Sequence, residues 1–99
     1  MNESEERQTV DVPQGEPFEL ILDSIPSAGA LWSHIPKSKE LEFLEEKRVV
    51  EDKKVGSPMR QIFRFRPSEA GVFELQFELK RKWEREPRRT KTISVRVLG

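Results

Sequence analysis

Apolar and polar residues alternate along most of this chain with a period of two, which is typical of β-strands with one buried face. The alternation is clearest over residues 72–80, where the apolar positions include Phe73, Leu75, Phe77 and Leu79. This segment is expected to be a central strand. Similar alternation, or a short apolar run between turn residues, predicts six further strands, at residues 8–12, 17–23, 30–35, 41–50, 61–65 and 92–97.

The segment 41–50 fits two patterns. Leu41, Leu44 and Val49 would share one face of a helix, whereas Leu41 and Phe43 lie two residues apart, as inward positions of a strand do. The Val49-Val50 pair also fits a strand, and we favour the strand.

Turn residues separate these segments. Proline presets one turn dihedral, and glycine adopts the positive φ that many turns require. The predicted turns and loops lie at residues 13–16, 24–29, 51–59, 67–71 and 81–89.

With about seven short strands and no convincing helix, residues 8–99 are predicted to form a single all-β domain, an immunoglobulin-like two-sheet β-sandwich. Residues 1–7 are charged and lack apolar residues after Met1, so this segment is expected to be disordered.

Composition fits one small domain. The chain has 99 residues, of which 34% are hydrophobic and 36% charged, so its one core must be built from few side chains at the right spacing. The net charge is zero, but residues 1–50 carry five Lys or Arg against eleven Asp or Glu, and residues 51–99 carry thirteen against seven. No predicted strand is both long and apolar on both faces, so a monomer is expected.

Membrane and thiol chemistry are not expected. No apolar run approaches the roughly 20 residues that cross a bilayer, and residues 1–7 do not resemble a signal peptide. We therefore expect a soluble protein without a membrane partner, either cytoplasmic or exported with its signal removed. The chain has no cysteine, which excludes a disulfide, a thiolate nucleophile and a cysteine-based metal site.

Candidate catalytic residues are few. His34 is the only histidine, so a histidine-pair metal site or a Ser/His/Asp triad would depend on it alone. The Glu45-Glu46 and Glu51-Asp52 pairs are sequence neighbours, which point to opposite faces of a strand and cannot act together as acid and base. We expect both pairs to be solvated. The chain is therefore predicted not to be an enzyme and to hold no metal or cofactor.

The two tryptophans have different surroundings. Trp83 stands in a predicted loop, and residues 80–91 around it contain seven cations. A tryptophan beside arginine is common at the centre of interfaces. The alternative is that Trp83 folds back over the edge of the sandwich. Trp32 lies in a predicted strand and is expected in the core.

Three loops of the chain resemble those of the chagasin-like inhibitors of papain-type cysteine proteases. The first, Ile25-Pro26-Ser27-Ala28-Gly29, is followed by Trp32, as the family's Asn-Pro-Thr-Thr-Gly loop is followed by a tryptophan. The second, Val55-Gly56-Ser57-Pro58, takes the place of a glycine-rich loop before a strand. The third, Arg81-Lys82-Trp83, matches the family's Arg-Pro-Trp at its first and last residues. The resemblance extends over residues 8–98.

The resemblance implies a reversible, competitive inhibitor that binds a papain-like cysteine protease with three loops at one end of the sandwich. A loop braced by Pro26 and Gly29 would cross the catalytic thiolate without presenting a peptide bond in the geometry for attack. Trp83 and Arg81 would contact the wall of the cleft. This prediction requires the Pro26, Gly56 and Trp83 loops to lie at the same end of the domain.

Two other functions stay open. A generic immunoglobulin-like binding or adhesion module would use the same fold without a protease partner. A nucleic-acid binder would use the cations of residues 80–91, with Trp83 as a stacking platform. Glu84 and Glu86 interrupt that basic run, and the net charge is zero. Neither alternative requires the three loops to share one end, so the position of the loops separates them from the inhibitor.

Overall fold

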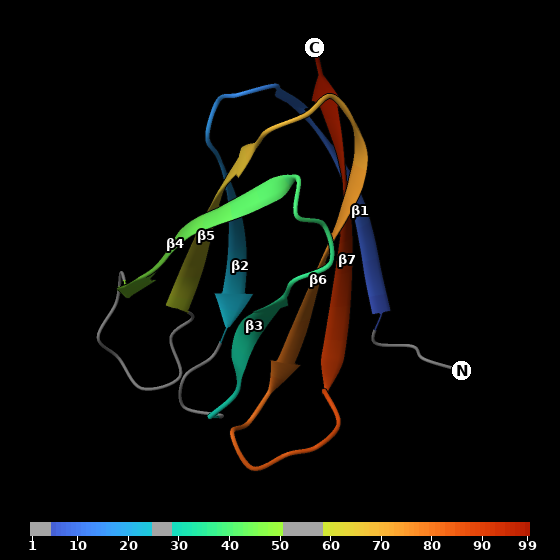
Figure 1. Ribbon diagram of the computed structural model, residues 1–99. Helices are drawn as coiled ribbons and strands as arrows, with labels where there is room; N and C mark the ends of the chain where they lie inside the picture. Colours follow the sequence, from blue (N-terminus) through green and yellow to red (C-terminus); the bar gives the residue numbers. More distant parts are fainter. Residues whose placement is uncertain (1–4, 25–28, 51–58) are drawn as a thin grey trace.

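The protein is described here by a computed structural model that covers residues 5–24, 29–50 and 59–99 (Figure 1). The strands are β1 (Glu5–Pro13), β2 (Phe18–Ser24), β3 (Leu31–Ile35), β4 (Leu41–Val50), β5 (Met59–Pro67), β6 (Gly71–Lys80) and β7 (Arg89–Leu98). These residues contain no helix, and so none long and apolar enough to cross a membrane. The predicted all-β class is confirmed.

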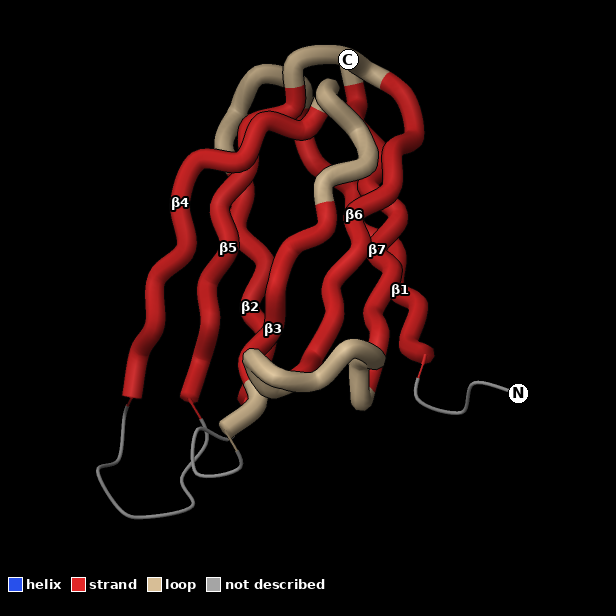
Figure 2. Tube along the Cα trace, turned by 60° about the horizontal axis from the view of Figure 1, so that its bottom comes forward, coloured by secondary structure: helices blue, strands red, loops and turns tan. Residues whose placement is uncertain are grey.

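Two sheets form a sandwich. One sheet has the strand order β1-β7-β6-β3 and the other the order β2-β5-β4. Neighbouring strands are antiparallel except β1 and β7, which run parallel. Figure 2 shows β4 and β5 on one side of the molecule and β6, β7 and β1 on the other. The predicted immunoglobulin-like two-sheet sandwich is confirmed, with β3 and β4 at the edges of opposite sheets.

The core consists of the residues that the alternation points inward. In β6, Leu75 and Phe77 are buried, whereas Glu74, just before Leu75, is exposed. Phe63 and Phe65 of β5 are buried from the opposite sheet, and the rings of Phe63 and Phe77 meet with centroids 4.9 Å apart. Removal of this apolar surface from water is the main stabilising term of the fold.

Segment 41–50 is strand β4, as favoured from the sequence, and a β-bulge explains its mixed pattern. Phe43 pairs with Phe65, but the next partner pair along the strands is Glu45 with Arg64, so Leu44 is an extra residue on the β4 side. One extra residue shifts the inward and outward positions of a strand. The apolar residues on either side of the bulge therefore no longer follow a strict period of two.

Strand β1 begins at Glu5, three residues earlier than the sequence predicts. Glu5 pairs with Thr90 of β7, and the carboxylate of Glu6 forms ion pairs with Arg89 and Lys91. Residues 5–7 are thus part of β1. These ion pairs between opposite charges on adjacent strands help to hold the start of β1, which has no apolar side chains, against β7.

Candidate functional site

Three strand ends next to residues 25–28 and 51–58 lie at one end of the three-stranded sheet. Ser24, the last residue of β2, pairs with Met59, the first residue of β5. Met59 also pairs with Val50, the last residue of β4. The ends of β2 and β4 and the start of β5 therefore lie on one rung of this sheet.

The four-stranded sheet has one loop of its own between two paired strand ends. Leu31, the first residue of β3, pairs with Lys80, the last residue of β6. Strand β7 begins at Arg89, opposite Leu79. The loop of residues 81–88 joins β6 to β7 here, at the lower end of the molecule in Figure 1.

Gln61 joins the two sheets close to these strand ends. Its side-chain Oε1 accepts a hydrogen bond from the Trp32 backbone N–H at 2.9 Å, and its Nε2 donates to the Trp32 carbonyl oxygen at 3.0 Å. Gln61 is 0% exposed, and an unpaired amide at such a position would be costly. The side-chain amide takes the place that the backbone of a neighbouring strand would occupy. The strand ends that flank all three predicted loops therefore lie at the same end of the sandwich.

Trp32 fixes both ends of the first loop. Its indole Nε1–H donates to the carbonyl oxygen of Asp23, the next-to-last residue of β2, at 2.9 Å. Its backbone is held by Gln61 at the start of β3. Trp32 is 4% exposed, as expected for a core residue. The chain between Asp23 and Trp32 therefore starts and ends at fixed points, which lowers the conformational entropy that it can lose on binding.

Glu46 of β4 extends this network to the surface. Its Oε2 accepts hydrogen bonds from Arg48 Nε at 2.8 Å and from Gln61 Nε2 at 3.0 Å. The hydrogen bond from Arg48 holds the pKa of Glu46 below its ordinary value, with a further contribution from Gln61 and against the effect of burial. The expectation that the Glu45-Glu46 pair is simply solvated is wrong for Glu46, which binds an amide in the core. The Glu51-Asp52 pair lies outside the described residues.

The loop of residues 81–88 presents Trp83 to solvent. Trp83 is 74% exposed, so the alternative in which it covers the edge of the sandwich is wrong. The guanidinium carbon of Arg81 lies 5.8 Å from the centroid of the Trp83 ring, within the range of a cation–π interaction. Lys82, between them, is also exposed. Lys82 and Trp83 are therefore exposed at this end of the domain, and Arg81 is half-buried beside them.

Gly29 brings the end of the first loop next to the third. Its φ is +77°, in the left-handed region that favours glycine. A Cβ atom at Gly29 would lie 3.8 Å from Cγ and Nε of Arg81, so these two predicted site residues are neighbours. The remaining predicted site residues lie outside the described part of the chain: Ile25, Pro26, Ser27, Ala28, Val55, Gly56, Ser57 and Pro58.

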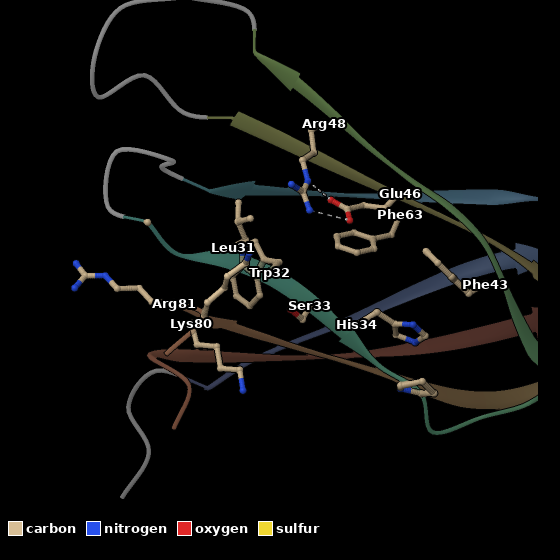
Figure 3. Close-up of a pocket in the computed structure, with 13 residues that line it drawn as sticks. Leu31, Trp32, Ser33, His34, Phe43, Glu46, Arg48, Phe63, Lys80 and Arg81 are labelled. Carbon is tan, nitrogen blue, oxygen red and sulfur yellow. Dashed lines mark hydrogen bonds and ion pairs between the residues drawn. The ribbon is translucent and has the colours of Figure 1, made fainter. Parts of the chain in front are cut away.

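A groove of about 520 Å³ lies between the edge strands β3 and β4 (Figure 3). Gly29, Arg81 and Lys82 line it near the loops, and His34 and Phe43 line it farther along β3 and β4. The groove thus begins beside the residues that the first and third loops contribute.

His34 lies on strand β3, in an aromatic environment. The centroid of its ring is 4.9 Å from that of Phe65, 5.6 Å from that of Phe77 and 5.7 Å from that of Phe43. Its Nε2 is buried and has no hydrogen-bond partner among the described residues. Burial lowers the pKa of His34, which favours the neutral ring. These contacts are those of a structural histidine.

Gln61 and Glu46 were not predicted as site residues from the sequence. A signal for Gln61 was present, because it stands two residues before Phe63 at an inward position of β5. A polar residue at a buried position of a strand needs a hydrogen-bond partner. Its partner is the backbone of Trp32. Every residue has the same backbone atoms, so the sequence pattern does not show which backbone will be the partner.

Comparison with known proteins places the chain in a family. Residues 11–97 match the family described as chagasin family peptidase inhibitor I42. Because this match covers most of the chain, the chain belongs to the chagasin family. The family is one of peptidase inhibitors and not of enzymes. A search of curated protein sequences finds no match.

Several solved structures have a similar fold. The cysteine protease inhibitor EhICP2 from Entamoeba histolytica is 21% identical, with a TM-score of 0.78 and coverage of 94% of this chain and 88% of that chain. PbICP-C, solved in complex with falcipain-2, is 18% identical, with a TM-score of 0.79 and coverage of 98% and 92%. The solution structure of Amebosin is 21% identical, with a TM-score of 0.58 and coverage of 94% and 98%. At these identities the likeness supports the fold.

Proposed function

We propose that the chain is a reversible, competitive inhibitor of papain-like cysteine proteases. It would block the active-site cleft with residues 25–29, 55–58 and 81–83. The observation that carries the proposal is the meeting of the strand ends around all three loops at one end of the sandwich, where Trp83 is exposed. Membership of a peptidase-inhibitor family supports this class of activity. One structure of similar fold, PbICP-C, contains falcipain-2 as its partner.

In this proposal the first loop lies along the catalytic thiolate. Trp32 holds both ends of this segment, through Asp23 before it and Gln61 beside it. A peptide bond held away from the attack geometry is not cleaved, because the reacting atoms never reach alignment. Anchored ends reduce the entropy that binding costs. The result would be occupancy of the cleft without turnover.

The third loop supplies the anchor. Trp83 would pack on an apolar or aromatic wall of the cleft, and Arg81 beside it would reach a carboxylate of the protease. Residues 55–58 would contact the opposite side. One chain would bind one protease as a monomer, since the strand ends that flank all three loops belong to the same end of one domain.

A nucleic-acid function fits the structure less well. Several cations of the basic segment 80–91 are already engaged by carboxylates within the domain: Arg88 by Glu84, and Arg89 and Lys91 by Glu6. Each ion pair removes a charge that a phosphate would need.

The proposal is tested by titrating the purified chain into papain and into a cathepsin L-like protease with a fluorogenic substrate. We expect dose-dependent inhibition that is overcome by raising the substrate concentration and is reversed by dilution. Full protease activity with the folded chain present at micromolar concentration would exclude the proposal for these targets. The immunoglobulin-like binding module would then be the better description.

A further inference from the structure

The loop of residues 81–88 is folded around one carboxylate. The backbone N–H of Glu84 donates to the carbonyl oxygen of Arg81 at 3.1 Å, which closes a turn. In return, the backbone N–H of Arg81 donates to Oε1 of the Glu84 side chain at 2.8 Å. These two reciprocal hydrogen bonds fix both ends of the turn 81–84, and the one to the carboxylate is charge-assisted.

The same carboxylate reaches across the loop. Nε of Arg88 donates to Oε1 of Glu84 at 3.1 Å and to Oε2 at 3.3 Å. The backbone N–H of Arg88 in turn donates to the carbonyl oxygen of Leu79, at the end of β6, at 2.7 Å. Glu84 therefore connects the outgoing side of the loop to the returning side. Its side chain is 25% exposed, so these bonds are partly shielded from water.

Trp83 depends on this turn for its position. It is the residue before Glu84, and its side chain is 74% exposed, so little packing restrains the ring. The contact found for the ring is with the guanidinium of Arg81, at the other end of the same turn. The direction in which the indole projects is therefore set largely by the backbone of residues 81–84.

We propose that Glu84 is the positioning residue of the third loop, holding Trp83 in the orientation in which it meets its partner. This inference rests on the proposed protease-binding function. A pre-ordered loop binds more tightly because less conformational entropy is lost in the complex. Without the carboxylate, the Trp83 side chain would still be present, but it would adopt several orientations.

The protonation state of Glu84 gives this role a pH signature. The charged groups that face its carboxylate are Arg81 and Arg88, and the hydrogen bond from the Arg81 backbone is the main reason why the pKa of Glu84 is lowered. The ionised, ordered loop therefore persists into mildly acidic solution. As the pH falls through the lowered pKa, the carboxylate gains a proton and the inhibition constant should rise. A Glu84→Gln variant cannot show this step.

The test measures the inhibition constant against papain for wild type, Glu84→Ala and Glu84→Gln. Glu86→Gln is the matched control, because it removes a carboxylate from the same loop. We expect Glu84→Ala to weaken inhibition about tenfold, which corresponds to about 1.4 kcal/mol. Glu84→Gln should weaken it less, because its amide oxygen can still accept from Arg81, and Glu86→Gln should leave it unchanged.

A double-mutant cycle separates positioning from a general effect on the loop. In a Trp83→Ala background, Glu84→Ala should have almost no further effect, because the side chain that it positions is gone. Equal losses in both backgrounds, or no loss from Glu84→Ala in wild type, would overturn the assignment.

A second readout does not depend on protease. In the free chain, the {¹H}-¹⁵N nuclear Overhauser effect of the Trp83 amide should fall in Glu84→Ala and stay unchanged in Glu86→Gln. Absence of inhibition by a wild-type chain with an ordered Trp83 would contradict the proposed function alone. An unchanged Overhauser effect in Glu84→Ala would contradict the role of Glu84.

Discussion

The side-chain amide of Gln61 in β5 forms two hydrogen bonds with the backbone of Trp32 in β3, one to its N–H and one to its carbonyl oxygen. The two residues belong to different sheets, and both lie near the strand ends from which the predicted binding loops leave. A buried polar bond therefore joins the two sheets at the functional end, in addition to the apolar contacts of the core.

Replacement of Gln61 by Leu should destabilise the domain strongly. It would leave the N–H and the carbonyl oxygen of Trp32 without their side-chain partner, and a buried unsatisfied polar group costs about 1–3 kcal/mol. We expect the free energy of unfolding, measured by urea titration, to fall by about 3 kcal/mol. Gln76→Leu is the control, because Gln76 lies on the outer face of β6, away from the core. This substitution should change the free energy of unfolding by less than about 0.5 kcal/mol. Equal effects of the two substitutions would contradict this role of Gln61.

Gly29 and Gly15 offer a matched pair at opposite ends of the domain. Both have positive φ, +77° and +82°. A Cβ atom would meet nothing within 4 Å at Gly15 and only the Arg81 side chain, at 3.8 Å, at Gly29. Alanine at either position should lower the free energy of unfolding by about 1 kcal/mol, because the left-handed backbone is strained for alanine. Only Gly29→Ala, which lies beside Arg81, should also weaken protease inhibition. If Gly15→Ala weakens inhibition equally, the effect comes from stability and not from the loop.

His34 should make the stability of the domain depend on pH. Its pKa in the folded state is lowered by burial from a reference value of 6.5. As the pH falls below about 6.5, the unfolded chain binds a proton that the folded chain does not, so the free energy of unfolding decreases until the folded pKa is reached. Urea titrations at several pH values should show this slope in wild type and a smaller slope in His34→Phe. Identical slopes in the two proteins would contradict this account.

The sequence was most informative where one face of a strand is buried. In β6 the alternation identified the inward residues, including Leu75 and Phe77, because burial on one side alone leaves a period of two. In β4 the same rule gave an ambiguous pattern, because the bulge at Leu44 shifts the period within the strand. A bulge depends on pairing with β5, which is a long-range property.

The site was predicted less completely than the fold. Arg81 and Trp83 could be identified as loop residues because turn and strand signals bound the loop on both sides. The hydrogen bonds that give this end its geometry involve backbone atoms of Trp32, Asp23 and Arg81. Backbone atoms are present at every position, so no pattern of residue types shows which of them will be bonded.

Trp83 should contribute to binding and not to folding. At 74% exposure its replacement by alanine removes little buried surface, so the midpoint of thermal unfolding should be unchanged within error. The inhibition constant should rise at least about tenfold, because a tryptophan at the centre of an interface is among the most costly residues to truncate. Lys82→Ala, next to it, should have a smaller effect. A loss of stability that parallels the loss of inhibition would argue that Trp83 is structural.

The central claim is that the loop end of the domain occupies the active-site cleft of a papain-like protease. The most direct measurement compares, by calorimetry, the binding of the chain to active papain and to papain whose catalytic cysteine carries a peptidyl group that fills the cleft. We predict a one-to-one complex with active papain and an affinity at least about 100-fold lower for the blocked enzyme. Equal affinities would place the contact outside the cleft and contradict the account.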